Sequence, residues 1–427
     1  MEYRDFDLWI EAATPRGYPL RAVSETQGGV NDWMVLDPQS PALQGYKKKI
    51  REEKTDVAFL IEFGTYLYNI LITGTVGSLF EASLGEIARQ EGQGLRLRLH
   101  IAPPEVAALP WEFLYSPLQH YFIGTSVKTP LTRHPHVFQP IQVLKTSLPL
   151  HVLVAIPDGS GLNIAAEKEA LEDVSHRLDD AVQFKLLEGK VTRSTLSDAL
   201  IERQYHAFHF IGHTAFAGDQ GGVLFNGEEE RFDIIDDEVF ARFFLDHQSL
   251  KLVILNTCRG ARRSPTRPMT GIAQKLVVRG IPAVVAHQYP LTDAASIRFA
   301  REFYRSLCIG PQAGHVDAAV AYARNQLSIH FPAEPALGAP VLFLRSPEGL
   351  IFDLVGARQE QTQPPEAPEL SPKECKRLEH LLTTHERNRR VLEEQILRMG
   401  AFAPDYMKAQ LAEETAAIEE IRQKLGR

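Results

Sequence analysis

A histidine and a cysteine each follow an apolar run, and together these residue types can make a nucleophilic pair. His213 comes directly after HAFHFIG, and Cys258 comes directly after KLVILNT. The thiolate is the reactive form of cysteine, whose ordinary pKa of about 8.5 leaves the thiol mostly protonated at neutral pH. A nearby imidazole can generate the thiolate and later protonate a leaving amine, while backbone N–H groups at Gly212 and Cys258 can hold an oxyanion. The chemistry would be acyl transfer through a thioester.

The spacing by itself leaves a second interpretation open. Cys258 can equally be a small apolar residue at a strand end, and His213 an ordinary loop histidine. The segment between them is long enough for a crossover between adjacent parallel strands. Adjacent strands would bring the imidazole and the thiol to one edge of the sheet.

The elements that would position this pair form an α/β pattern from about residue 148 to 355. Short runs rich in valine and isoleucine alternate there with amphipathic segments, which predicts βα units around central parallel strands covered on both faces. The predicted strands are 151–156, 206–211, 251–256, 282–287 and 340–345. Residues 1–145 open with a hairpin pattern and contain the alternating run LRLRLHIA, which predicts an α+β segment that supports the substrate side.

The end of the chain has a different composition. Residues 357–372 are polar and proline-rich, which indicates a linker. Residues 373–427 contain two charged segments with one apolar stripe each, which predicts a coiled-coil-like helical hairpin. Two short helices are marginal alone, so we expect residues 373–425 to bind a regulatory partner or a second copy, or to pack back on the preceding domain.

A series of motifs resembles the CHAT family of clan CD cysteine peptidases, which are relatives of caspases and separases. The matching segments are, in order, LRLRLHIAPPEVAALPWEFLYSP, KTPLTRHP, FIGHTAF, GGVLF, LVILNTCRGA, GIAQKLVVRGIPAVVAHQYPLTDAA and FAREFYRSL, within roughly residues 95–355. The resemblance implies a caspase-like, mostly parallel sheet flanked by helices over residues 146–356. It assigns His213 as general base and acid and Cys258 as nucleophile of an endopeptidase, in regulated proteolysis of an antiviral defence or cell-death type. One departure is Thr214, which stands where the family commonly has glycine.

Asp293 has two interpretations. It follows PAVVAHQYPLT and resembles the aspartate that lines the specificity pocket of separases, which implies substrate binding with a preference for arginine or lysine before the cut bond. Asp293 beside Thr292 at a helix start also fits a capping or dipole-compensating acid.

Composition narrows the remaining possibilities. A net charge of -8 argues against nucleic acid as the main partner, although the arginine-rich loop 259–268 keeps a nucleic-acid-binding regulator, an acidic partner or a processing site open. No membrane span, secretory signal or disulfide spacing is evident, so we expect a cytoplasmic protein. We expect no cofactor and no metal, since His206 and His209 lie within an apolar strand pattern, and we expect Trp111 to be a packing residue. The alternative to a peptidase is an inactive caspase-like scaffold that recruits protein partners through the hairpin.

Overall fold

The computed structural model describes residues 1–135, 142–157, 164–187, 189–217, 220–229, 232–257 and 270–354. The chain forms two compact units, Met1–Ala357 and Arg358–Arg427. The predicted linker 357–372 lies outside the described residues, and so does most of the predicted hairpin. The described positions of the second unit are all helical: Leu382, His385, Glu386, Arg387, Arg389, Arg390, Glu393, Leu411, Thr415 and Ile418.

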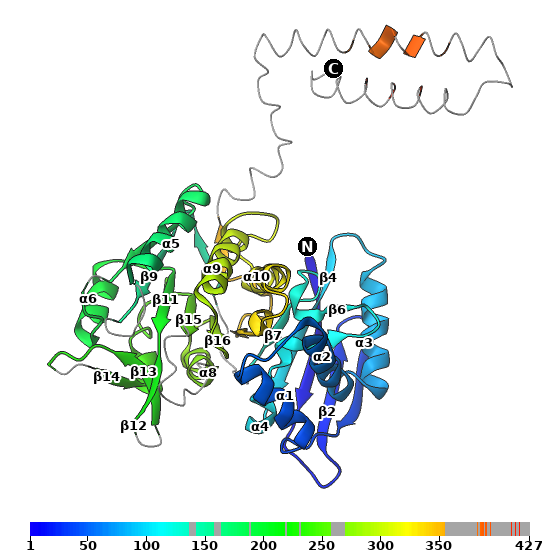
Figure 1. The fold of residues 1–427 in the computed structure, drawn as a ribbon, viewed down its shortest axis with the longest axis horizontal. Helices are drawn as coiled ribbons and strands as arrows, with labels where there is room; N and C mark the ends of the chain where they lie inside the picture. Colours follow the sequence, from blue (N-terminus) through cyan, green and yellow to red (C-terminus); the bar gives the residue numbers. More distant parts are fainter. Residues whose placement is uncertain are drawn as a thin grey trace. The chain divides into compact units, whose positions relative to one another are not determined.

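An eleven-stranded sheet runs through the first unit (Figure 1), in the order β10-β9-β11-β15-β16-β17-β7-β4-β1-β2-β3. Its strands are β1 (Glu2–Ile10), β2 (Tyr18–Ser24), β3 (Gly28–Met34), β4 (Gln93–Ile101), β7 (Leu131–Arg133), β9 (Leu150–Ala155), β10 (Val182–Leu186), β11 (Ala207–Gly212), β15 (Leu252–Thr257), β16 (Ala283–His287) and β17 (Pro340–Leu344). Residues 1–145 and 146–356 therefore contribute to one continuous sheet.

Strand direction divides nine of the eleven strands into two parallel blocks, and β2 and β3 continue the sheet antiparallel. Strands β10, β9, β11, β15 and β16 are parallel to one another. Strands β17, β7, β4 and β1 form the second parallel block, and β17 pairs with β16 antiparallel. The predicted mixed α/β fold with a large, mostly parallel sheet is confirmed. The expectation that the strand at 340–345 runs parallel with the other central strands is wrong, because an apolar run shows that a strand is buried on both faces but not which way it runs.

The helices of the first unit cover the large sheet, and the block that contains β11 and β15 is covered on both faces. They are α1 (Pro41–Arg51), α2 (Val57–Leu71), α3 (Gly74–Ile87), α4 (Pro104–Ala107), α5 (Ile164–Arg177), α6 (Arg193–Glu202), α7 (Asp237–Arg242), α8 (Thr270–Arg279), α9 (Asp293–Cys308) and α10 (Val316–His330). One core lies between the sheet and α1, α2, α3, α5, α9 and α10, and a second lies between the sheet and α6, α7 and α8. Among the described residues no single helix is long and apolar enough to cross a membrane; α2 and α3 reach that length and apolarity only as a pair bent by 108°.

Alternation along β11 explains how one strand serves both cores. Ala207 and Ile211 belong to the core under α5 and α9, whereas Phe208 and Phe210 belong to the core under α6 and α7. Successive side chains of a strand point to opposite faces, so a run that is apolar at nearly every position fits a strand covered on both sides.

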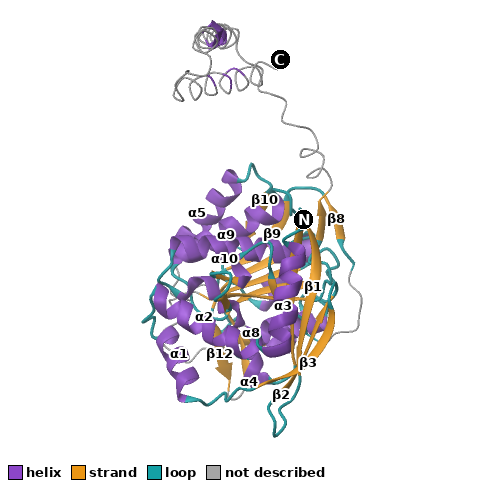
Figure 2. Cartoon of the chain, turned by 90° about the vertical axis from the view of Figure 1, so that its right-hand side faces the viewer, coloured by secondary structure: helices purple, strands orange, loops and turns teal. Residues whose placement is uncertain are grey.

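Short strands complete the fold. They are β5 (Tyr115–Ser116), β6 (Tyr121–Phe122), β8 (Leu144–Thr146), β12 (Thr214–Ala217), β13 (Gln220–Phe225), β14 (Asp233–Asp236) and β18 (Phe352–Leu354). Strands β12, β13 and β14 form a separate antiparallel sheet that leaves the large sheet at the end of β11. At the opposite side of the unit, β1, β2 and β3 form the edge seen in Figure 2.

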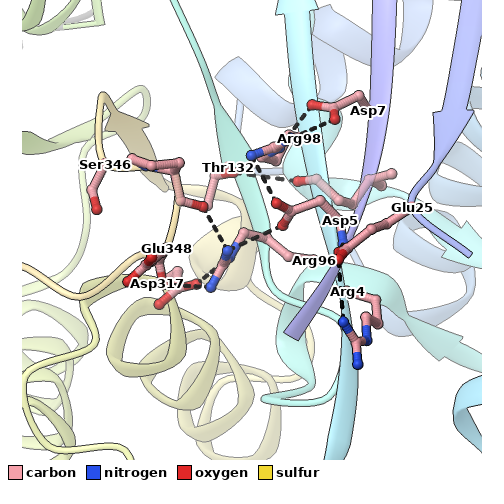
Figure 3. Close-up of polar contacts among 12 residues, drawn as sticks. Arg4, Asp5, Asp7, Glu25, Arg96, Arg98, Thr132, Asp317, Ser346 and Glu348 are labelled. Atoms are coloured by element: carbon pink, nitrogen blue, oxygen red, sulfur yellow. Dashed lines mark hydrogen bonds and ion pairs between the residues drawn. The ribbon is translucent and has the colours of Figure 1, made fainter. Parts of the chain in front are cut away.

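A buried arginine joins the N-terminal strands to α10 (Figure 3). Arg96 donates from Nε to Oδ2 of Asp317 at 2.7 Å and from Nη1 to Oδ1 of Asp5 at 3.1 Å. It also donates to the backbone carbonyls of Pro347 and Glu348, at 2.7 and 2.5 Å. Burial acts to lower the pKa of Arg96, but Asp317 and Asp5 together raise it, so the guanidinium stays charged. The network ties β1 and β4 to the helix that covers the sheet.

Candidate catalytic site

His213 lies at the point where the chain leaves the large sheet. It is buried, and its carbonyl oxygen accepts a hydrogen bond from the N–H of Leu224 in β13 at 2.9 Å. A Cβ at Gly212, the residue before it, would come within 2.6 Å of the ring of Phe210. Only glycine therefore fits at this close approach, and β13 then holds the backbone of His213 in place.

The register of β11 and β15 brings the predicted catalytic pair to the same level of the sheet. Gly212, the last residue of β11, lies directly opposite Thr257, the last residue of β15. Neighbouring strands are about 4.8 Å apart. His213 and Cys258 are the residues that follow. The prediction that their two strands are adjacent and parallel is confirmed, while Cys258 itself and the loop 259–268 lie outside the described residues.

Asp293 is the first residue of α9 and is exposed. The capping hydrogen bond is made by its neighbour Thr292, whose Oγ1 accepts from the N–H of Ala295 at 3.2 Å. Asp293 therefore adds negative charge to the first turn of the helix, where the dipole favours it, but is not the cap. Because α9 follows β16, which is parallel to β15, Asp293 comes after the same edge of the sheet as the predicted pair. Its role in substrate binding stays a prediction.

A polar group lies in the buried layer below this edge. Asn256 donates from Nδ2 to Nε2 of His209 at 2.8 Å, and Nδ1 of His209 is 3.3 Å from the hydroxyl of Tyr304 in α9. Burial lowers the pKa of His209 to about 3, so the ring is neutral. A neutral ring that accepts at Nε2 donates at Nδ1, which makes Tyr304 the acceptor. Our sequence reasoning missed Asn256, although an asparagine within an otherwise apolar run was the available signal.

The other histidines in or beside the strands make contacts away from His213. His206 precedes β11, stacks on His151 at 5.5 Å between ring centroids, and accepts at Nδ1 from the N–H of His151 at 2.9 Å. His287 ends β16 and packs its ring edge-on against Phe299 at 5.1 Å. Within the described ranges, no group of three or more histidine, cysteine or acidic residues is arranged to hold a metal ion.

The segment that contains Trp111 and Glu112 contacts the loop between β16 and α9, which leads to Asp293. Trp111 is fully buried and its Nε1 donates to the carbonyl of Val106 at 2.9 Å, which confirms it as a packing residue. Glu112 accepts from Nη2 of Arg133 at 2.7 Å and from Nε2 of Gln288 at 2.8 Å. Gln288 directly follows β16. This contact, which sequence reasoning did not predict, anchors the start of the β16–α9 loop to the N-terminal segment.

Comparison with known proteins gives a family match and two structural likenesses. A family model described as the CHAT domain matches residues 62–330. Among solved structures, the chain is similar to two crystal structures of the Saccharomyces cerevisiae separase–securin complex, with TM-scores of 0.35 and 0.33 and sequence identities of 15% and 17%. Each likeness covers 72% of this chain, but the chain spans only 20% and 19% of the separase chains. None of the curated proteins matches it. Because the family match covers more than half of the sequence, the chain belongs to the CHAT domain family.

Proposed function

We propose that this protein is a cysteine endopeptidase that cleaves a protein substrate with His213 and Cys258. The observation that carries the proposal is the strand register that places Gly212 opposite Thr257. His213 and Cys258, the proposed catalytic residues, directly follow these two positions. Membership of the CHAT domain family supports the same assignment.

The proposed reaction has two steps. The Cys258 thiolate attacks the carbonyl carbon of the scissile peptide, and His213 donates its proton to the leaving amine, which leaves a thioester on Cys258. Water then attacks the thioester with His213 as general base, and the carboxylic acid product and the free thiol are released. Backbone N–H groups of Gly212 and Cys258 would stabilise the oxyanion in both steps.

The proposed specificity is for arginine or lysine before the cut bond. Asp293 supports it, since this carboxylate is exposed and forms no ion pair with another described residue, and Thr292 already makes the capping hydrogen bond. A carboxylate in that position selects a cationic side chain. Profiling cleavage sites in a peptide library tests this, and a dominant acidic or apolar preference would refute it. Asp293→Asn should weaken a basic preference and lower stability by no more than about 1 kcal/mol.

The dyad is tested by comparing Cys258→Ala and His213→Ala with a matched cysteine control, Cys308→Ala. Both dyad variants should lose peptide cleavage to a similar extent, because the two side chains act as one unit. Burial raises the pKa of the Cys308 thiol to about 12, so this cysteine should react with an electrophilic peptide probe far more slowly than Cys258. Wild-type turnover in Cys258→Ala, with an unchanged circular dichroism spectrum, would show the assignment to be wrong.

The proposed partner is a regulatory protein or a second copy bound through residues 373–425. The described residues of this stretch are helical, which supports a helical recruiting element. Truncation after residue 362 should leave small-peptide cleavage intact and abolish association; a truncated protein that keeps its partners and association state refutes recruitment. The inactive scaffold is the better assignment if the wild-type protein binds partners but cleaves no peptide, and if both dyad variants behave in the same way. A defence or cell-death pathway and a cytoplasmic location are part of the same proposal.

A further inference from the structure

Asn256 is a buried polar residue in a strand that is otherwise apolar and leads directly to the proposed nucleophile. It is 2% exposed, and its strand neighbours Leu252 and Ile254 belong to the core under α5 and α9. Side chains alternate along a strand, so Asn256 lies on the same face as Ile254 and precedes Cys258 by two residues. Buried polar groups in a core are costly, and those that persist commonly serve a site.

One half of the Asn256 amide is held in place. Its Nδ2 donates to Nε2 of His209 at 2.8 Å, and His209 in turn donates from Nδ1 toward the Tyr304 hydroxyl at 3.3 Å. Both partners are almost fully buried, which leaves the three groups little freedom to move. The orientation of the amide is therefore set by β11 and α9, not by solvent.

The carbonyl oxygen of the Asn256 amide can accept a further hydrogen bond. Oδ1 of Asn256 is buried, and it accepts no hydrogen bond from any residue that the structure describes. The small cavity beside it is lined by apolar side chains of α5 and α9, by Ile211, by the neutral His209 and by the Ser296 hydroxyl. The neighbouring strand β16 contributes His287, which burial and, secondarily, His209 keep neutral by lowering its pKa to about 3. No described charged group lines this cavity.

Two arginines of α9 are engaged elsewhere, and Asp293 is exposed at the start of the helix. Arg298 and Arg301 both donate to Oε1 of Glu302, at 3.1 and 2.7 Å. The titratable groups that face Asn256 within the described chain are thus His209, Tyr304 and His287, each neutral at physiological pH. An acceptor oxygen in such surroundings interacts strongly with any cation formed next to it.

His213 is the residue that becomes such a cation in the proposed mechanism. Ile211 lies opposite Asn256 in the β11–β15 register, and His213 follows Ile211 by two residues, just past the end of β11. Nδ1 of His213 is buried. An imidazolium donates from both nitrogens, so when one N–H faces the thiolate the other needs an acceptor.

We propose that Asn256 is a positioning residue, whose Oδ1 accepts a hydrogen bond from the His213 imidazolium while Cys258 is a thiolate. This inference rests on the proposed dyad and deepens it. The hydrogen bond stabilises the ion pair, orients the imidazole toward the thiolate, and so lowers the pH at which Cys258 becomes reactive. The same arrangement explains why a neutral His209 is retained beneath the site, since it fixes the amide.

The test measures the rate of Cys258 alkylation by iodoacetamide against pH in the full-length protein, together with kcat and KM. Asn256→Leu should raise the pH midpoint by about one unit and lower kcat about tenfold with little change in KM, as expected for a lost hydrogen bond to a charged group. Asn256→Asp keeps an acceptor oxygen, since the His209 tautomer can reverse, and should restore a midpoint at or below that of the wild type. Ser296→Ala removes a hydroxyl from the same cavity and should leave the midpoint unchanged.

A double variant guards against a folding defect. His209→Leu with Asn256→Leu replaces both polar partners by apolar groups, which proteins tolerate better than loss of one; it should fold and show the same raised midpoint. If Asn256→Leu or the double variant folds and keeps the wild-type pH midpoint and kcat, the role of Asn256 is refuted. The peptidase assignment is not affected by that result. If the wild-type protein shows no turnover and its Cys258 is alkylated with a pH midpoint near the ordinary value of about 8.5, both the dyad and this inference are refuted.

Discussion

Replacing Asp317 by alanine should remove a large part of the stability of the first unit. Asp317 lies in the first turn of α10, and its side chain is fully buried against Arg96, which is 4% exposed. The substitution leaves the guanidinium of Arg96 in the core with the carboxylate of Asp5 at 3.1 Å and two backbone carbonyls (Figure 3). An uncompensated buried charge is the expected cause of the loss.

The magnitude follows from what remains around Arg96. Breaking a buried ion pair by removing one partner costs about 3 to 5 kcal/mol. Because Asp5 still faces the guanidinium, and its side chain is 22% exposed, we expect a value near the lower limit, about 3 kcal/mol. Loss of an acidic residue from the first turn of α10 adds roughly 0.3 to 1 kcal/mol. These losses are a substantial share of the 5 to 15 kcal/mol that is usual for a folded domain.

The assay is urea unfolding, with the shift in midpoint read at constant slope. Arg4→Ala is the matched control, since it breaks a surface pair with Glu25 at 3.2 Å and should cost at most about 1 kcal/mol. Arg96→Met with Asp317→Leu should recover most of the loss, because both charges are removed together. The reasoning is refuted if Asp317→Ala costs no more than Arg4→Ala, or if the double variant costs the sum of its two single substitutions.

Two further predictions concern acid stability and helix packing. Burial holds the pKa of His287 at about 3, below the value of about 6.5 expected for the unfolded chain, so the unfolded state binds the proton first and stability falls as pH drops from 6.5 toward 3. In unfolding measurements at pH 7.5, 6 and 5, His287→Phe should leave the slope near pH 7.5 almost unchanged and reduce it by about 1 kcal/mol per pH unit at pH 6, approaching about 1.4 at pH 5; an unchanged slope at pH 5 would contradict the assignment. In α2, a Cβ at Gly64 would lie 2.3 Å from the carbonyl oxygen of Phe113, whereas Gly45 in α1 has open space around it. Gly64→Ala should therefore lower the melting temperature although alanine favours helix, and Gly45→Ala should raise stability by about 0.5 to 1 kcal/mol; the same sign for both would refute the packing argument.

The sequence alone located most strands of the large sheet and their order along the chain, but not β3, β7 or β10. The five strands predicted between residues 148 and 355 agree with β9, β11, β15, β16 and β17 to within one residue at either end. Apolar runs of this length are buried in any fold, and neighbouring glycine and proline residues mark where a strand ends. The local sequence pattern is therefore sufficient to locate these strands. The same pattern located His213 immediately after a strand that proved to be the neighbour of the one leading to Cys258.

Strand direction and side-chain partners were decided by the tertiary structure. The antiparallel pairing of β17 with β16 depends on the path of the chain through α9 and α10, which no local run of residues records. The contact of Glu112 with Gln288 and that of Arg96 with Asp317 join residues far apart in sequence. A polar residue in an apolar run signals that a partner is needed but not which partner, because alternation assigns a side chain to a face, whereas packing alone chooses its neighbour. For Asn256 that neighbour is His209, on the strand beside its own.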